Sequence, residues 1–534
     1  MAQLDMPVGD IHGNARRIRE AVVQARDRHG ADLVVFPELA IAGYPPEDLL
    51  LRPGFVRHAG EALESLAAEV RGIEAVIGFP ERDGDTLYNS CAWVADGRVQ
   101  AVYRKSALPN YAVFDEKRYF QGADQPLVRE CAGQRVGVVI CEDLWEREPV
   151  ARCAEAGARI IVSPNASPYA LGKRRERREL VSGLARQHGV SMIYCNLVGG
   201  QDELVFDGGD FAASPDGAST GQAPACEEGL FAVQWDAGAG WRRLGWEPAG
   251  EGDEDAEVWT VLSRGLRDYV DKNGFPGVLL GLSGGIDSAL VATLAADALG
   301  AERVGCVTMP ARYTADISTE DAEALANNLG IRVRKLPVDG VFQSFLDLLE
   351  PAFGDREPDV TEENLQARIR GTILMALSNK FGDLLLATGN KSELAVGYAT
   401  LYGDMNGGFA PIKDCYKTRV YRLAQWRNGR SPAIPGRIIQ RPPSAELAAD
   451  QTDQDSLPPY DELDAILERY IERTQSVREI AAAGFDEGTV RRVASMVLKS
   501  EYKRRQGAPG PRITPCAFGR DRRYPITSGW REDA

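Results

Sequence analysis

Short apolar runs alternate with longer stretches of helical periodicity along most of the chain. The apolar runs cover residues 33–39, 74–80, 135–143, 159–165 and 191–198, and then 277–283, 303–310 and 383–390. Between them lie stretches such as residues 317–330, where apolar positions recur at the spacing of one helix face. Strand–helix alternation of this kind predicts an α/β fold in both halves of the chain.

Both patterns break near residues 236–256, a segment rich in Gly, Ala and acidic residues. We therefore predict two domains, residues 1–245 and 246–534, which a chain of 534 residues readily accommodates. A short internal repeat is absent from the sequence, which argues against a solenoid.

The amino-acid composition indicates which kinds of binding partner are unfavourable for this chain. Lys and Arg total 62 against 78 Asp and Glu, so the net charge of −16 argues against nucleic acid or an anionic membrane. Apolar runs stay below the ~18 residues of a membrane helix, and we see no signal-peptide pattern. The nine cysteines lack CxxC spacing. This indicates reduced thiols, so we expect a cytoplasmic protein without a zinc site.

The most informative stretch is LLGLSGGIDSA at residues 279–289, an apolar strand that breaks into a glycine loop and then a helix. Such a loop offers bare N–H groups and a positive dipole end to an anion, and Ser283 and Ser288 add hydroxyl donors. Asp287 would repel phosphates unless a divalent cation bridges them. No lysine follows the glycines, so this is not the GxxxxGK[ST] loop. The alternative is a glycine turn that merely joins strand to helix.

Three polar residues of the first half each follow an apolar strand: Glu38, Lys105 and Cys141. Strand ends tend to converge on one crevice of an α/β sheet. There a carboxylate could take the thiol proton, and an ammonium could stabilise both the thiolate and an oxyanion. Taken alone, Cys141 would more often be a core thiol, so the joint placement carries the hypothesis.

These segments resemble the nitrilase superfamily, through FPELAIAGYPPEDLL, YRKSALPNYAVFDEKRYF, CEDLW and SPNASPY. The resemblance implies an αββα sandwich. In it Glu38 is the general base, Lys105 the oxyanion stabiliser, Cys141 the nucleophile and Glu116 a carboxylate that orients the lysine. It further implies that glutamine is held by Tyr111, Ser167 and Lys173, although the charged run around Lys173 could equally be a solvated helix face.

The SGGIDS loop resembles that of the ATP pyrophosphatases, which implies a Rossmann-like parallel sheet. Together with the first half, residues 282–300, 309–331, 363–371, 385–418 and 500–506 are similar to the glutamine-dependent NAD synthetases over nearly the whole chain. The resemblance implies that the carboxylate of deamido-NAD attacks the α-phosphate of ATP. Ammonia from glutamine then displaces AMP to give NAD. A homo-oligomer is also expected.

The same resemblance implies the residues of the second site. ATP is expected to contact Gly281, Leu282, Ser283, Gly284, Gly285, Ile286, Asp287, Ser288 and Thr388. Deamido-NAD is expected to contact Asn364, Glu393 and Lys503, while Asp287 and Glu393 are expected to bind Mg²⁺. For Glu393 the alternative is a solvated helix residue. The basic run 503–512 could suggest nucleic acid, but it lacks interleaved aromatic residues, so dinucleotide phosphate is the better partner.

Two departures from that family and three alternatives remain. The chain opens at MAQLD, short of the apolar residues expected in the first strand, and Asp210 stands where a serine is expected.

One alternative function is a synthetase with an inactive first domain, for which free ammonia is the nitrogen donor. Another is that the second half acts on a different substrate, as the GMP and asparagine synthetases and the tRNA thiolation enzymes do with the same loop. The third is a nucleotide-sensing protein without activity.

Overall fold

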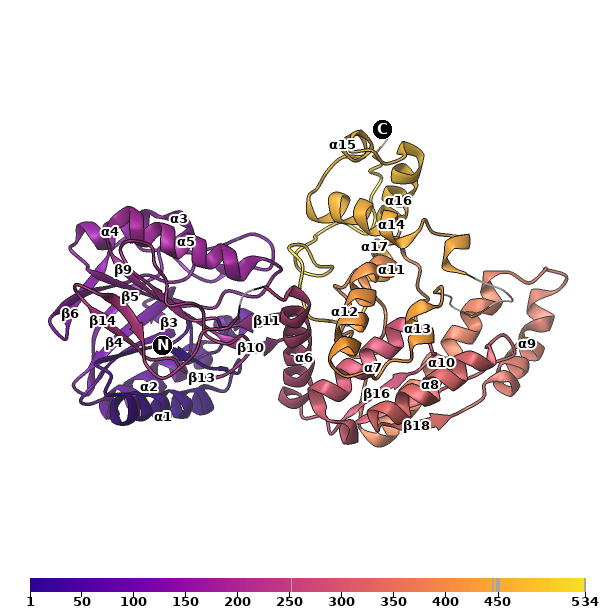
Figure 1. The fold of residues 1–534 in the computed structure, drawn as a ribbon, viewed down its shortest axis with the longest axis horizontal. Helices are drawn as coiled ribbons and strands as arrows, with labels where there is room; N and C mark the ends of the chain where they lie inside the picture. Colours follow the sequence, from indigo (N-terminus) through magenta and orange to yellow (C-terminus); the bar gives the residue numbers. More distant parts are fainter. Residues whose placement is uncertain (251, 444–445, 448–451, 533–534) are drawn as a thin grey trace. The chain divides into compact units, whose positions relative to one another are not determined.

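The computed structural model describes residues 1–250, 252–443, 446–447 and 452–532 (Figure 1). They form two compact units, Met1–Asp253 and Glu254–Ala534. Both units combine β-sheet with helices, which confirms the α/β class predicted from the alternation of runs. Among the described residues, no helix combines the length and the apolar composition needed to cross a lipid bilayer.

Two sheets face each other in the first unit. One has the order β2-β3-β4-β5, formed by β2 (Leu33–Val35), β3 (Glu74–Asp83), β4 (Thr86–Ala95) and β5 (Arg98–Arg104). The other has the order β12-β9-β8-β7-β6, formed by β6 (Leu127–Cys131), β7 (Gln134–Val138), β8 (Ile160–Asn165), β9 (Ser191–Asn196) and β12 (Phe211–Ala213). Strands β7, β8 and β9 are parallel. Buried side chains from both sheets, among them Trp93 and Val162, form one core between them.

Helices cover the outer face of each sheet (Figure 1). α1 (Ile11–His29) and α2 (Pro53–Glu69) pack on the first sheet, while α3 (Asp143–Glu146), α4 (Glu148–Glu155) and α5 (Lys173–His188) pack on the second. The unit is therefore the predicted αββα sandwich. Three small antiparallel pairs complete it: β1 (Ala2–Gln3) with β13 (Gly229–Leu230), β10 (Val198–Gln201) with β11 (Leu204–Asp207), and β14 (Val233–Asp236) with β15 (Gly240–Arg243).

A parallel four-stranded sheet of order β18-β17-β16-β19 forms the centre of the second unit. Its strands are β16 (Val278–Gly281), β17 (Val304–Thr308), β18 (Arg332–Lys335) and β19 (Leu384–Leu385). The helix α7 (Ile286–Leu299) follows β16 and is buried on nearly all sides, as its almost uninterrupted apolar sequence requires. This arrangement confirms the predicted Rossmann-like sheet, with the glycine loop at the carboxyl end of β16.

Further helices surround this sheet and build a second core (Figure 1). They are α6 (Glu254–Lys272), α8 (Asp316–Leu329), α9 (Asp339–Phe353), α10 (Val360–Phe381), α11 (Lys391–Val396), α12 (Lys417–Arg430), α13 (Gly436–Gln440), α14 (Tyr460–Leu467), α15 (Val477–Ala482), α16 (Glu487–Lys499) and α17 (Glu501–Arg504). Apolar residues of α11, α14, α15 and α16 share one cluster, which holds the C-terminal helices against α11.

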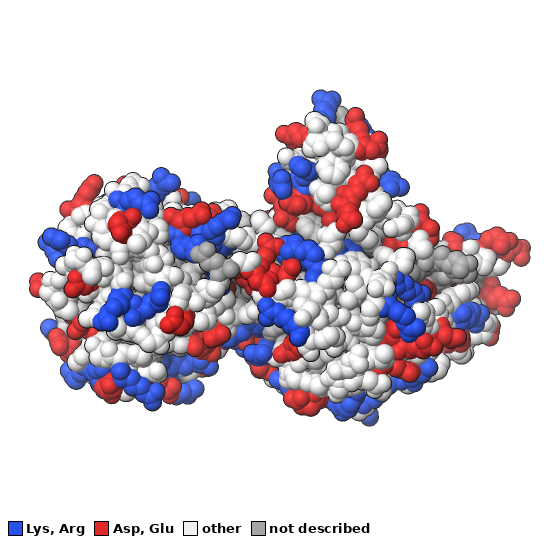
Figure 2. Space-filling view, in the orientation of Figure 1, with Lys and Arg blue, Asp and Glu red and all other residues white. Residues whose placement is uncertain are grey.

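Charged side chains of both signs are interspersed on the face of each unit shown in Figure 2. Acidic and basic side chains thus lie next to one another on that face. A mixed surface of this kind favours solubility more than binding to a polyanion.

Candidate functional sites

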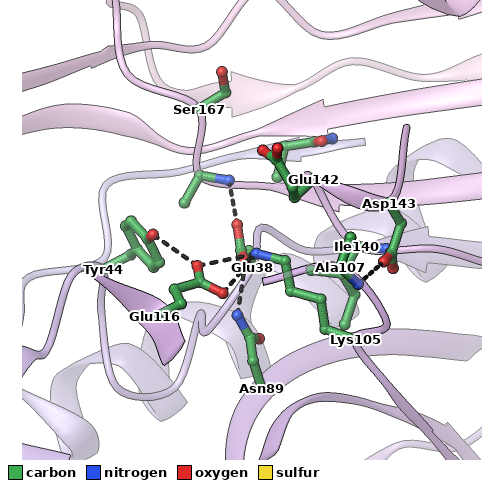
Figure 3. A network of polar contacts seen from close by, with 12 residues as sticks. Glu38, Tyr44, Asn89, Lys105, Ala107, Glu116, Ile140, Glu142, Asp143 and Ser167 are labelled. Atoms are coloured by element: carbon green, nitrogen blue, oxygen red, sulfur yellow. Dashed lines mark hydrogen bonds and ion pairs between the residues drawn. The ribbon is translucent and has the colours of Figure 1, made fainter. Parts of the chain in front are cut away.

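Three charged side chains of the first unit meet at one point (Figure 3), two of them from strand ends and one, Glu116, from a short 3-10 helix. Lys105, just after β5, places its Nζ 2.6 Å from Oε1 of Glu38, which follows β2. The same Nζ lies 2.9 Å from both carboxylate oxygens of Glu116. All three side chains are at most 5% exposed. The sequence predicted that Glu38 and Lys105 converge with Cys141, and the structure places Glu38 and Lys105 in direct contact. Glu116, which the family resemblance assigned to orient the lysine, contacts Lys105 as well.

Each carboxylate of this cluster has further donors that fix its orientation. Glu38 Oε1 accepts a hydrogen bond from Asn89 Nδ2 at 2.7 Å, and its Oε2 accepts one from Ala166 N at 3.0 Å. Glu116 Oε1 accepts one from the Tyr44 hydroxyl at 2.8 Å. Rigid orientation of this kind is what a group acting on a reacting atom needs.

Burial sets the protonation of the cluster. Burial disfavours the Lys105 ammonium, but the neighbouring Glu116 and Glu38 carboxylates more than offset this and raise the lysine pKa well above its usual range. Burial also raises the pKa of Glu116 to about 7, although Lys105 acts in the opposite direction. The lysine is therefore a permanent cation and hydrogen-bond donor at neutral pH.

Cys141 follows β7 and is 6% exposed, with a left-handed backbone φ of 45°. Asp143 holds this turn, because its carboxylate accepts from the backbone N–H groups of Ile140 and Ala107, each at 2.8 Å. The same carboxylate accepts a hydrogen bond from Tyr103 on β5 at 2.8 Å, so the thiol turn is tied to the strand that carries Lys105. A left-handed non-glycine residue stabilised by its surroundings is typical of a functional turn.

The thiol of Cys141 is protonated in the resting structure. Burial raises its pKa well above the usual range, and Glu38 adds to this effect while Lys105 opposes it. A thiol in this state needs a base before it can act as a nucleophile. Glu38 is a carboxylate whose charge acts directly on that thiol, which makes it the candidate base.

Tyr111 and Glu142 form a pair next to Cys141. The Tyr111 hydroxyl donates to Glu142 Oε1 at 3.0 Å, while the Tyr111 side chain remains 55% exposed. Burial raises the pKa of Glu142. Sequence reasoning named Tyr111 but missed Glu142, although its position directly after the cysteine was a usable signal.

Ser167 follows β8 of the second sheet, and Lys173 opens α5. Ser167 is buried directly after Ala166, whose N–H binds Glu38. The Lys173 ammonium stacks 3.8 Å from the ring centre of Trp145 and lies 3.0 Å from Glu176. Burial lowers the Lys173 pKa, although the hydrogen bond with Glu176 acts in the opposite direction.

Asp210 is fully buried and connects to Ser167 through one residue. Its Oδ1 accepts a hydrogen bond from Asn196 N at 2.7 Å, and Asn196 Oδ1 accepts one from Ser167 N at 2.9 Å. The unexpected carboxylate is therefore part of the support of Ser167 and lies behind that residue.

A cavity of about 300 Å³ opens at the carboxyl end of β16 in the second unit. Its lining includes nine of the predicted residues or their neighbours in the loop: Gly281, Leu282, Ser283, Gly285, Ile286, Asp287, Ser288, Thr388 and Glu393. Gly284 lies behind this lining, where its φ of 84° and the Ser318 carbonyl, 2.3 Å from an added Cβ, leave space for glycine only. The loop opens α7, which brings the positive end of the helix dipole to the cavity, and within the loop the N–H groups of Ser283 and Gly285 donate to the hydroxyls of Ser288 and Ser283.

Asp287 and Glu393 share one buried ammonium in this cavity. Lys417 Nζ lies 2.5 Å from Asp287 Oδ2 and 3.0 Å from Glu393 Oε1. Asn390 caps α11 by accepting from Glu393 N at 3.0 Å, and its Nδ2 donates to Asp287 Oδ1 at 2.8 Å. Sequence reasoning missed Lys417, because a lysine that opens a helix far from both carboxylates has no local signature.

Asn364 and Lys503 are outside the cavity lining but adjoin it. Asn364 Oδ1 accepts from the Thr400 hydroxyl at 2.9 Å, and Lys503 Nζ donates to the carbonyls of Gly397 and Ala399 at 2.7 and 2.8 Å. Ala399 itself lines the cavity. Both side chains thus contact residues 397–400, a segment that borders the cavity.

The paired carboxylates suit a divalent cation. Mg²⁺ usually keeps several waters and binds through one or two carboxylates together with substrate phosphates. Asp287 and Glu393 supply two such groups beside a phosphate-type loop, and they are already held around a positive charge. The donor set therefore fits the ion that the sequence predicted.

Comparison with known proteins covers the whole chain. A carbon-nitrogen hydrolase family model matches residues 1–242, and an NAD synthase model matches residues 258–507. The glutamine-dependent NAD(+) synthetase of Xanthomonas campestris is 53% identical over 536 residues, covering 99% of this chain and 97% of that protein. That of Acinetobacter baylyi is 50% identical over 537 residues, covering 100% and 98%.

Solved structures agree with these matches. The glutamine-dependent NAD+ synthetase of Acinetobacter baumannii, in complex with ADP, matches with a TM-score of 0.81 and 47% identity, covering 100% of this chain and 99% of that one. A synthetase structure from Cytophaga hutchinsonii, at 24% identity, matches in fold with a TM-score of 0.85, covering 99% and 97%. The resemblance seen in the sequence is confirmed: this chain belongs to the glutamine-dependent NAD(+) synthetase family.

Proposed function

We propose that the first unit hydrolyses glutamine and that the second uses the ammonia to convert deamido-NAD to NAD at the expense of ATP. The assignment gives residues 1–245 to the glutaminase and 246–534 to the synthetase. One chain of this family contains both sets of groups, and this observation supports the assignment most directly. The first unit has Glu38 and Lys105 in contact near Cys141, and the second has the glycine loop with Asp287 and Glu393. An inactive first domain is disfavoured, because Glu38, Lys105 and Cys141 are all present and oriented.

The glutaminase step follows from the protonation states of the cluster. Glu38 takes the proton of the Cys141 thiol, and the thiolate attacks the amide carbon of glutamine. Lys105 donates a hydrogen bond to the resulting oxyanion, because an ammonium has three N–H donors to share among its partners. Glu38 returns the proton to the leaving nitrogen, so ammonia departs and a thioester remains. Water, deprotonated by Glu38, then releases glutamate and restores the thiol.

Recognition of glutamine needs both signs of charge around Cys141. Lys173 is the candidate partner of the α-carboxylate, and Glu142 with Tyr111 is the candidate partner of the α-ammonium. The hydroxyl of Ser167 supplies a further polar contact. Both charged partners are partly desolvated, which strengthens their interaction with a zwitterion.

The synthetase step uses the cavity of the second unit. The N–H groups of the loop after β16 and the N-terminus of α7 hold the ATP phosphates, and Thr388 lies opposite. The carboxylate of deamido-NAD attacks the α-phosphorus, pyrophosphate leaves, and ammonia displaces AMP from the acyl adenylate to form the amide. Asp287 and Glu393 would hold Mg²⁺, which supplies neutralisation of phosphate charge. Asn364 and Lys503 border the cavity where the dinucleotide is expected.

The decisive experiment follows NAD formation by the purified full chain. With deamido-NAD, ATP, MgCl₂ and glutamine, we expect NAD, AMP, pyrophosphate and glutamate. Cys141→Ala should lose synthesis with glutamine but keep it with a high concentration of ammonium chloride. Asp287→Asn should lose synthesis with either donor while glutamine hydrolysis survives. Failure of the unmodified chain to form NAD with both donors would overturn the proposal.

A further inference from the structure

A buried arginine beside the glutaminase site has no role in the steps above. Arg177 lies on α5, and its side chain is 1% exposed. Its guanidinium forms an ion pair with Asp207, with Nη1 2.7 Å from Oδ1. Nη2 donates to the carbonyls of Ser167 at 2.8 Å and Pro168 at 2.6 Å. Burying such a group is costly unless it is fully bonded, so these contacts fix it in one orientation.

The same guanidinium reaches the hydroxyl of Ser167. Arg177 Nε lies 3.1 Å from Ser167 Oγ. A guanidinium only donates hydrogen bonds, so the serine oxygen must be the acceptor of this one. The hydroxyl hydrogen of Ser167 therefore points away from Arg177 and remains able to donate to another group.

Asn196 holds the backbone of Ser167 through two hydrogen bonds. Its Oδ1 accepts from Ser167 N at 2.9 Å, and its Nδ2 donates to Ser167 O at 3.1 Å. The serine thus has its N–H, carbonyl and hydroxyl oxygen all engaged by buried side chains. Tyr194 is a buried hydroxyl beside both Ser167 and Arg177, so it could compete for the serine hydrogen.

We propose that Arg177 is a positioning residue for glutamine, which holds Ser167 as a hydrogen-bond donor directed at a substrate oxygen. The inference rests on the proposed glutaminase function and extends it. The Ser167 hydroxyl would donate a hydrogen bond to an acceptor atom of glutamine, such as a carboxylate oxygen or the amide oxygen. It would not bind the ammonium of the substrate.

The test measures glutamine hydrolysis by the full chain carrying Arg177→Lys. Lysine can keep the charge facing Asp207, but its single nitrogen cannot bond Asp207, Ser167 Oγ and the two carbonyls together. We expect KM for glutamine to rise about tenfold, the effect of one lost hydrogen bond in a charged setting, with kcat within threefold. Synthesis of NAD with ammonium chloride should be unchanged.

A double-mutant cycle with Ser167→Ala separates positioning from general support of the fold. Ser167→Ala alone should also raise KM about tenfold, and adding Arg177→Lys to it should add less than threefold. Independent tenfold effects that multiply would overturn the proposal. Tyr194→Phe should leave KM within threefold; a tenfold rise there would show that the serine hydrogen is directed to Tyr194, and would also overturn it.

Arg174→Lys is the matched control. Arg174 lies one turn earlier on α5, 3.9 Å from Asp207 Oδ2, and donates to the Ala223 carbonyl rather than to Ser167. It should keep KM within threefold, and equal KM rises in both lysine variants would count against Arg177. If Arg177→Lys unfolds at a lower temperature, the paired change Arg177→Gln with Asp207→Asn removes both buried charges and must show the same KM rise. Absence of glutamine hydrolysis in the unmodified chain would instead refute the proposed function.

Discussion

Replacing Asp210 by asparagine should stabilise the first unit at alkaline pH much more than at acidic pH. The side chain is fully buried, and burial raises its pKa to about 7 from the ordinary 3.8. Asparagine removes the charge but keeps an acceptor oxygen for Asn196 N, 2.7 Å from Oδ1. The change therefore isolates the cost of ionising this carboxylate.

The sign follows from proton uptake. Between pH 3.8 and about 7 the folded state holds a proton that the unfolded state has released, so stability falls as pH rises through this window. The whole shift of about 3 pKa units corresponds to about 4 kcal/mol, and about 3 kcal/mol of it falls between pH 5 and pH 8. Asn cannot titrate, so the variant escapes this loss.

Thermal unfolding of the full chain at pH 5 and pH 8 measures the effect. We expect the Tm advantage of Asp210→Asn over the unmodified chain to grow by several degrees between the two pH values, at roughly 2 °C per kcal/mol. Asp202→Asn is the control, because this exposed carboxylate lies in the nearby β10–β11 turn. An advantage that is equal at both pH values would show that Asp210 is not protonated in the folded state.

Three further changes test the two sites. Gly284→Ala should abolish NAD synthesis but leave glutamine hydrolysis intact, because the added Cβ would lie 2.3 Å from the Ser318 carbonyl oxygen. Gly274→Ala is the control, since Gly274 has a similar φ and open space around it. Equal NAD synthesis by both variants would contradict the steric argument. Lys417→Met should destabilise the second unit by about 3–5 kcal/mol, because two buried carboxylates lose their cation; MgCl₂ should raise its Tm more than that of the unmodified chain, and an equal rise would count against the metal assignment. Glu116→Gln should lower the kcat of glutamine hydrolysis about 100-fold with little change in ammonia-dependent synthesis, and unchanged hydrolysis would remove Glu116 from the site.

The fold and the first site were largely predictable, because polar residues that follow apolar strands indicate where a site forms. Glu38, Lys105 and Cys141 each follow an apolar run, and parallel or facing strands bring such ends together. The glycine loop was equally readable, since a strand, two glycines and a helix specify their own geometry. The catalytic roles of these residues stay predictions, because proximity alone does not show chemistry.

Apart from Glu142, the residues that sequence reasoning missed have contacts that the local sequence does not reveal. Lys417 is 130 residues from Asp287, and Asn196 meets Ser167 across 29 residues. Arg177 stands in a charged run whose default interpretation is a solvated face, yet it is buried while Arg175 is exposed. Helical periodicity assigns faces, but it does not say which face has an acidic partner such as Asp207 beneath it.

Three buried lysines of this chain each lie between two carboxylates, and their surroundings separate structure from function. Lys391 Nζ is 2.9 Å from both Asp414 and Glu472, and Thr514 and the Cys516 carbonyl complete its shell. Asp414 also accepts the N–H groups of Ile513 and Thr514, so this closed cluster is fully bonded and ties the C-terminal segment to α11.

The clusters around Lys105 and Lys417 likewise place two carboxyl groups around one ammonium, but they adjoin a thiol and a cavity. Burial raises the pKa of Glu116 to about 7 and that of Glu393 to about 8, and the neighbouring carboxylate, Glu38 or Asp287, adds to each rise. A further positive charge is therefore favoured in each cluster. We propose that beside Cys141 this charge is the thiol proton that Glu38 would take up. Beside the glycine loop it would be a divalent cation held by Asp287 and Glu393. On this proposal, the same electrostatic arrangement would serve a base in the first unit and a metal site in the second.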